Sequence, residues 1–123
     1  MPDQAYLQVN GVSKKFGAGE TAVAALDQIS FTLDKGRFLS ILGPSGCGKS
    51  TLFNIIAGLM APDDGTVTLG GQSLVMNPGM TGYMLQKDLL LPWRTIADNI
   101  ILPRTLRGIS RRKALQEAAS DVQ

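Results

Sequence analysis

The residues with the clearest chemistry lie in one short segment, 43–51. The segment reads Gly-Pro-Ser-Gly-Cys-Gly-Lys-Ser-Thr, which fits the phosphate-loop pattern of a glycine, four residues, and then Gly-Lys-Ser. The glycines let the backbone curl until successive N–H groups point inward and bind phosphate oxygens. In this pattern the lysine, here Lys49, reaches the β- and γ-phosphates, and the hydroxyl of Ser50 binds Mg²⁺. The spacing therefore predicts a site for a nucleoside triphosphate and its magnesium ion.

The loop is flanked by the two elements that such a site needs. An apolar run at residues 38–42 precedes it and has the length of a buried strand. Apolar residues at helical spacing follow it, and Gly58 and Pro62 mark the end of that helix. A glycine-rich turn with a chance Lys-Ser is the alternative, but it would not explain a strand before the loop and a helix after it. The predicted nucleotide-binding residues of the loop are Gly43, Pro44, Ser45, Gly46, Cys47, Gly48, Lys49, Ser50 and Thr51.

Composition limits the possible partners and location. The chain has 123 residues, 44% of them hydrophobic, and a net charge of +2, which suits a soluble domain and gives no reason to predict nucleic-acid binding. Cys47 is the only cysteine, so no internal disulfide can form and a reducing cytosol is predicted. No apolar run approaches the ~18 residues of a membrane-spanning helix, and the N-terminus lacks a signal-peptide core.

The residues before the loop predict antiparallel strands. Residues 7–12 alternate between apolar and polar, as in an edge strand. The alternation stops at the glycines of residues 17–19 and resumes at 29–33. Residues 34–36, Asp-Lys-Gly, then predict a tight turn into the strand before the loop.

After the predicted helix, the alternating pattern returns. Residues 62–65 form a turn, and residues 66–69 alternate as in a strand. The paired glycines at 70–71 then predict a hairpin turn. Residues 82–85 predict a short buried strand that ends at Gln86.

The last part of the chain predicts helices. Thr95 and Asp98 have the spacing of a capping box that starts a helix. Pro103 is predicted to end or kink that helix, and Gly108 with Ser110 separates it from the next one. That final helix has an apolar stripe made of Ala114, Leu115, Ala118, Ala119 and Val122.

Taken together, these segments resemble one family. The matching segments are residues 43–59, 62–65, 82–86, 90–93 and 96–100. The whole chain resembles the N-terminal half of an ATP-binding subunit of an ABC transporter, and the last two segments are most similar to the nitrate, sulfonate, taurine and pyrimidine importers. The resemblance implies an α/β fold: a partial P-loop NTPase core with an N-terminal antiparallel β part at residues 1–86. The Q-loop and the beginning of a helical subdomain would follow at residues 87–123.

The resemblance also implies ligands and roles for single residues. ATP and Mg²⁺ would bind at the loop, and Phe16 would stack on adenine, with a place in the core as its alternative. Gln86 would contact Mg²⁺ and the attacking water, the alternative being an ordinary polar residue at the end of a strand. The loop at residues 89–93 would lie near the membrane subunit, although a buried Trp93 could equally fill the core. The basic residues between 104 and 113 could meet acidic loops of a partner, but we favour a solvated helix face.

The implied parent protein is an ATPase that couples ATP hydrolysis to solute import. Its partners would be transmembrane permease subunits, contacted through the Q-loop region, and a second ATP-binding subunit in a homodimer. Such a subunit is expected in the cytoplasm, peripheral on the inner face of the cell membrane.

The chain also departs from the family pattern. Residues 69–72, Leu-Gly-Gly-Gln, resemble the signature motif, but they lack its serine and precede Gln86, so we interpret them as the hairpin turn. No run of four apolar residues ending in Asp follows Gln86, and the chain has no histidine. The aspartate that holds Mg²⁺, the glutamate after it and the switch histidine are thus missing, which indicates a truncated chain.

Phosphoryl transfer needs a metal, a positioned water and charge stabilisation together. The candidate catalytic residues, Lys49 and Gln86, do not supply all three, so we expect the chain alone to be inactive. A natural short product that binds nucleotide without hydrolysis is the alternative. A small P-loop kinase is less well supported, because no arginine-bearing lid segment follows the loop.

Overall fold

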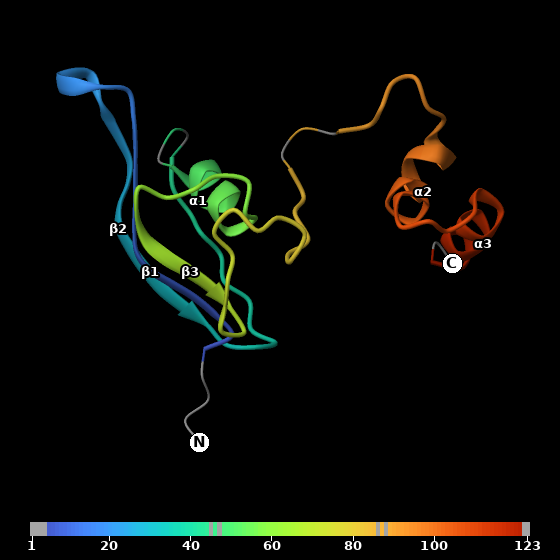
Figure 1. Ribbon diagram of the computed structural model, residues 1–123, viewed down its shortest axis with the longest axis horizontal. Coiled ribbons are helices and arrows are strands. Elements are labelled where there is room, and N and C mark those ends of the chain that lie inside the picture. The colour runs from blue at the N-terminus through green and yellow to red at the C-terminus, as the bar shows by residue number, and fades with distance from the viewer. Residues whose placement is uncertain (1–4, 45, 47, 86, 88, 122–123) are drawn as a thin grey trace. The chain divides into compact units, whose positions relative to one another are not determined.

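The computed structural model of the chain describes residues 5–44, 46, 48–85, 87 and 89–121. It divides into two compact units, Met1–Tyr83 and Met84–Gln123. The first unit holds a four-stranded sheet and one α-helix, and the second holds two helices (Figure 1). No helix among these residues has the length and apolar character needed to cross a membrane.

The sheet of the first unit is antiparallel. Its strands are β1 (Leu7–Phe16), β2 (Val23–Leu33), β3 (Asp64–Leu69) and the short β4 (Gln72–Ser73), in the order β2-β1-β3-β4. A single 3₁₀ turn, η1 (Gly19–Thr21), joins β1 to β2. The hairpin turn at residues 70–71 is confirmed, because Leu69 of β3 pairs with Gln72 of β4.

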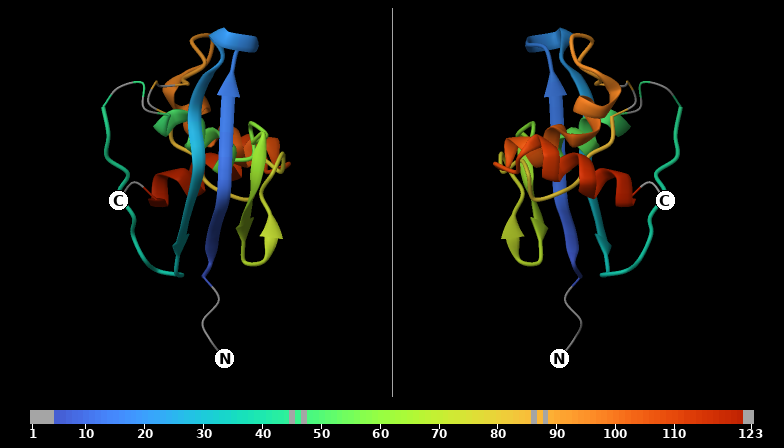
Figure 2. Two further views of the ribbon diagram at one scale, coloured as in Figure 1. Left: turned by 90° about the vertical axis from the view of Figure 1, so that its left-hand side faces the viewer. Right: turned by 90° about the vertical axis from the view of Figure 1, so that its right-hand side faces the viewer.

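The prediction of an edge strand at residues 7–12 is wrong. β1 lies inside the sheet, between β2 and β3, as Figure 2 shows. Val9, for example, pairs with Phe31 on one side and with Val67 on the other. Alternation of apolar and polar residues indicates that one face of the strand is buried and the other is exposed to solvent. It does not indicate whether the strand lies at the edge or in the centre of the sheet.

One face of this sheet is covered by α1 (Lys49–Ile56), the helix that the sequence predicts after the phosphate loop (Figure 1). Leu52 and Ile55 of α1 are buried against apolar side chains of the strands, which is what the helical spacing of these residues predicts. Gly58 follows the helix with φ +79°, so the predicted stop is confirmed. The buried core of the unit consists of Val9, Val12, Leu26, Leu52, Ile55, Val67 and Leu74.

Two predicted buried strands are not formed. Residues 38–42 and 82–85 are extended segments that pair with no strand among the described residues. Phe38 is 90% exposed, Leu42 is 92% exposed and Met84 is 95% exposed. A strand that is apolar on both faces needs hydrogen-bonded neighbours beside it and cover above and below. The described part of the chain supplies no such neighbour, so the apolar sequence alone does not produce the strand.

The second unit contains α2 (Ile96–Leu106) and α3 (Arg111–Asp121). The hydroxyl of Thr95 accepts a hydrogen bond from the N–H of Asp98 at 3.1 Å, which confirms the predicted cap. Pro103 does not end α2, since the helix continues for three residues to Leu106. A proline inside a helix removes an N–H donor and crowds the carbonyl group four residues before it. Ile101, two residues before Pro103, packs against Ala114 and Ala118 of α3.

The predicted stripe of α3 is only partly buried. Ala114 and Ala118 pack with Ile101, while Ala119 is exposed and Val122 lies outside the described residues. The basic residues on these helices are partly paired within the unit. Arg104 forms an ion pair with Glu117 at 3.3 Å, and Arg111 forms one with Asp98 at 2.9 Å.

Candidate phosphate-binding site

The phosphate loop connects the segment at residues 38–42 to the first turn of α1. Gly48 is the N-cap of the helix and has φ +95°, a left-handed conformation that glycine adopts without strain. A Cβ atom at this position would collide with the carbonyl oxygen of Ala25 in β2. Gly48 therefore lies directly against β2, and glycine is required at residue 48 for two independent reasons.

The start of α1 offers backbone donors to an anion. The first helical hydrogen bond runs from the N–H of Leu52 to the carbonyl oxygen of Gly48, at 3.0 Å. The N–H groups of Lys49, Ser50 and Thr51 precede this bond and so have no acceptor within the helix. They lie at the positive end of the helix dipole, which favours a bound phosphate.

Lys49 and Ser50 add side-chain groups at the same place. The ammonium group of Lys49 donates a hydrogen bond to the carbonyl oxygen of Gly43, so the side chain reaches back across the loop. Ser50 is exposed at the first turn of α1. This set of donors fits the phosphates of a nucleotide, and the hydroxyl of Ser50 fits one position on Mg²⁺. Among the described residues, no group of three or more acidic, His or Cys side chains is placed so that it could hold a metal ion.

Three predicted site residues cannot be assigned a position. Ser45, Cys47 and Gln86 lie outside the described residues. Their proposed contacts with phosphate or metal remain predictions.

Phe16 lies at the last residue of β1, where it pairs with Val23 at the start of β2. Val23 is only two residues from Ala25, whose carbonyl oxygen borders Gly48. Phe16 is 43% exposed, and the ammonium group of Lys14 lies 5.8 Å from the centre of its ring. The structure thus brings the predicted aromatic residue and the phosphate loop to the same end of β2.

Asp63 stabilises this end of the sheet, although no sequence pattern identifies it as important. One carboxylate oxygen accepts a hydrogen bond from the N–H of Lys15 at 2.8 Å, and the other accepts one from the ammonium group of Lys14 at 3.1 Å. The N–H of Asp63 also donates to the carbonyl oxygen of Ser13 at 2.9 Å. The hydrogen bond from Lys15, followed by that from Lys14, lowers the pKa of Asp63 below its ordinary value of 3.8. The three residues before Phe16, 13–15, are therefore all hydrogen-bonded to Asp63.

A second contact that was not predicted joins α1 to the segment at residues 82–85. The hydroxyl of Tyr83 donates a hydrogen bond to the side-chain oxygen of Asn54, at 2.9 Å. The sequence carries no signal for this pair, because Asn54 sits among the apolar residues of the predicted helix and its partner is 29 residues away.

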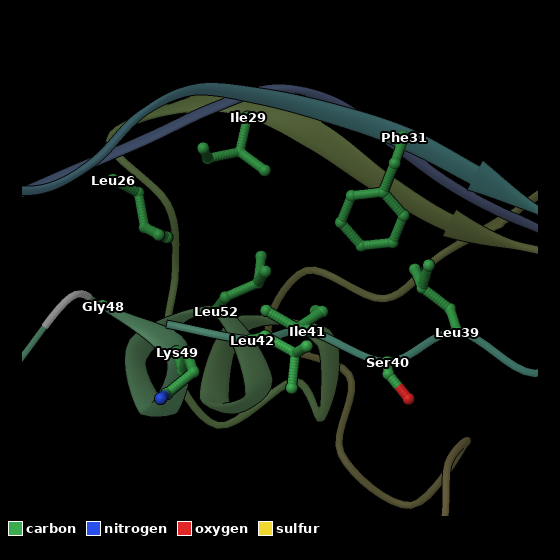
Figure 3. Close-up of a pocket in the computed structure, with 10 residues that line it drawn as sticks. All are labelled: Leu26, Ile29, Phe31, Leu39, Ser40, Ile41, Leu42, Gly48, Lys49 and Leu52. Atoms are coloured by element: carbon green, nitrogen blue, oxygen red, sulfur yellow. The ribbon is translucent and has the colours of Figure 1, made fainter. Parts of the chain in front are cut away.

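An apolar cavity of about 360 Å³ lies next to the phosphate loop. Figure 3 shows Ile29 and Phe31 pointing from β2 toward α1, with Lys49 at the end of the cavity nearest Gly48. The segment at residues 39–42 forms its other wall. Because most of the lining is hydrocarbon, this cavity does not suit phosphates, and the polar loop beside it is the better candidate for the nucleotide site.

Comparison with known proteins identifies the family. The protein-family profile described as "ABC transporter" matches residues 26–123, most of the chain. This chain belongs to the ABC transporter family. The resemblance inferred from residues 43–59 and 82–86 is confirmed.

Related ABC proteins include importer subunits. The chain is 43% identical to the taurine import ATP-binding protein TauB of Rhizobium johnstonii over 109 residues, which are 87% of this chain and 41% of TauB. It is 39% identical to the aliphatic sulfonates import ATP-binding protein SsuB of Bacillus cereus over 101 residues, 82% of this chain and 40% of SsuB. The chain thus spans about two fifths of the length of these relatives, whose names confirm the predicted likeness to taurine and sulfonate importers.

Solved structures of ABC cassettes share the fold. The ATP-binding cassette MJ0796, in a dimeric post-hydrolysis state bound to ADP and Pi, matches with a TM-score of 0.80 and 27% identity. The match covers 93% of this chain and 54% of that cassette. The predicted fold class, a partial P-loop NTPase core with an antiparallel β part, is therefore confirmed.

Proposed function

We propose that this chain is the part of an ABC importer's ATP-binding subunit that binds MgATP. The observation that supports this most directly is the start of α1, where three backbone N–H groups have no acceptor within the helix and the ammonium group of Lys49 reaches the carbonyl oxygen of Gly43. Lys49 would bind the β- and γ-phosphates, and Ser50 would bind Mg²⁺. The exposed ring of Phe16 would stack on adenine. Gln86 would orient the attacking water and contact the metal ion.

In the parent subunit, ATP hydrolysis would drive solute import. The names of TauB and SsuB support an importer. The dimeric state of the MJ0796 cassette supports pairing with a second ATP-binding subunit. An import subunit of this type would work in the cytoplasm, on the inner face of the membrane, with transmembrane permease subunits as partners.

The loop at residues 89–93 is the proposed contact with the permease. Within its unit, Leu89 is 67% exposed, Leu90 is 58% exposed and Trp93 is 76% exposed. These exposures argue against the alternative in which Trp93 fills the core of that unit. Clustered exposed apolar side chains are typical of protein interfaces.

The 123-residue chain alone should not hydrolyse ATP. A loop that binds the ground state and the transition state equally lowers no chemical barrier. Acceleration needs a base or a water-orienting group next to the nucleophile, and Gln86 is the only candidate that the sequence offers. The alternative, a natural short product that binds nucleotide without hydrolysis, makes the same prediction for this chain but involves no longer ATPase.

The test is equilibrium dialysis of the purified chain against MgATP, with phosphate release and transfer to small acceptors measured in the same samples. We expect bound ATP and no phosphate release above a Lys49→Ala control, which reveals contaminating ATPases. Absence of bound nucleotide would contradict the proposed site. Release well above the control would contradict inactivity of the chain, and phosphate transfer to an acceptor would indicate a kinase.

A further inference from the structure

The exposed residue Trp93 sits in a defined turn. The N–H of Arg94 donates a hydrogen bond to the carbonyl oxygen of Leu91 at 3.0 Å, which closes a four-residue β-turn. Pro92 and Trp93 are its two central residues. Proline is favoured at the first central position because its φ is already set. Trp93, at the second central position, is 76% exposed.

The side chain of Asn99, in the first turns of α2, holds both ends of this turn. Its Oδ1 atom accepts a hydrogen bond from the N–H of Leu91 at 2.7 Å, and its Nδ2 atom donates to the carbonyl oxygen of Leu91 at 3.2 Å. Nδ2 also lies 2.9 Å from the carbonyl oxygen of Thr95 and 3.4 Å from that of Arg94. One half-buried amide therefore pairs with the backbone on either side of Trp93.

We propose that Asn99 is a positioning residue that fixes the turn at residues 91–94 and so presents Trp93 as a preformed anchor for the permease. Tryptophan is frequent among residues that dominate interface energies. A side chain ordered before binding loses less conformational freedom on binding. A carboxamide supplies one acceptor and two donors together, which neither Ala nor an ionised Asp does. The anchor role rests on the proposed function, but the ordering of the turn does not.

The ordering is tested by ¹⁵N relaxation of the chain without nucleotide or partner. In the wild type, the amide of Trp93 should have an order parameter near the ~0.85 of rigid backbone, and in Asn99→Ala it should fall below ~0.6. Asp98→Asn is the matched control, because it weakens the neighbouring ion pair with Arg111 and leaves the amide of Asn99 in place. The amides of Ile101 and Ala118 should remain ordered in both variants, which separates loss of the turn from loss of the helices.

Unchanged order at Trp93 in Asn99→Ala would overturn the proposal, and so would equal loss of order at Ile101 and Ala118. Hydrogen exchange of the wild type gives a test that needs no variant. The N–H of Leu91 should be protected by Asn99, and free exchange of that N–H would also overturn the proposal.

The anchor role is measured separately, by retention of the chain on its co-expressed permease subunits in detergent. Trp93→Ala and Asn99→Ala should both reduce retention, and Asp98→Asn should not. Retention of Trp93→Ala equal to that of the wild type would contradict the anchor. Failure to bind MgATP would contradict only the proposed nucleotide site, so the two results can be told apart.

Discussion

Asp63 shows how one carboxylate organises the backbone that leads to a proposed binding residue. It accepts hydrogen bonds from two successive residues, Lys14 and Lys15, and the next residue is Phe16. The ammonium group of Lys14 also lies 5.8 Å from the centre of the Phe16 ring. The negative charge on Asp63 therefore helps to hold the strand end at which adenine would stack.

The pKa of Asp63 predicts how this support depends on pH. Because the folded-state pKa lies below the ordinary value of 3.8, the charged carboxylate stabilises the fold above pH 3.8. The stabilisation is lost as the pH falls through the lowered pKa. We expect Asp63→Asn to lower the melting temperature at neutral pH, and the difference from the wild type to shrink in acid. Thermal melts over a pH series measure it, with Asp64→Asn as a control of equal charge change. A difference that is constant with pH would contradict this role.

At the scale of single residues, a sequence pattern can predict a residue that contacts its neighbours in the chain or that binds a ligand. Lys49 and Ser50 are predictable because the loop pattern specifies them. Asp63 and Asn99 are not, because their importance comes from backbone groups that the fold brings to them. An aspartate in a turn, or an asparagine in the first turns of a helix, has the same local sequence whether or not it holds a distant strand or a loop.

At the scale of elements, the phosphate loop and α1 depend on contact with β2. Gly48 combines a positive φ with direct contact against the carbonyl oxygen of Ala25. The helix and its caps are predictable from the spacing of residues 49–58, because helical hydrogen bonds are local. Residues 38–42 and 82–85 show the opposite case, since a strand forms only where another strand pairs with it.

The contact at Gly48 predicts a large effect of one methyl group. Gly48→Ala should lose about 1–3 kcal/mol of unfolding free energy, because alanine is strained at this positive φ and its Cβ atom would push the backbone away from β2. Urea denaturation measures the loss. Gly19→Ala is the matched control, because Gly19 also has a positive φ, of +62°, but a Cβ there meets open space. Equal losses in the two variants would show that the contact with Ala25 contributes nothing.

At the scale of the whole molecule, the proposed function of this chain is binding of MgATP at the phosphate loop without hydrolysis. It spans about two fifths of the length of TauB and SsuB. The family and the antiparallel part of the sheet are predictable from the sequence, because they follow from contiguous motifs and alternation. Binding of nucleotide at the phosphate loop is the property that the proposed function assigns to this chain by itself.

Calorimetric titration of the chain with MgATP tests that property most directly. Hydrogen bonds to charged groups contribute ~1.5–3 kcal/mol, so Lys49→Ala should bind roughly 10- to 100-fold more weakly than the wild type. Lys113→Ala is the matched control, because it removes the same charge from the exposed start of α3 in the other unit. The account predicts wild-type affinity for Lys113→Ala and a large loss for Lys49→Ala. Equal affinity of the wild type and Lys49→Ala would contradict it.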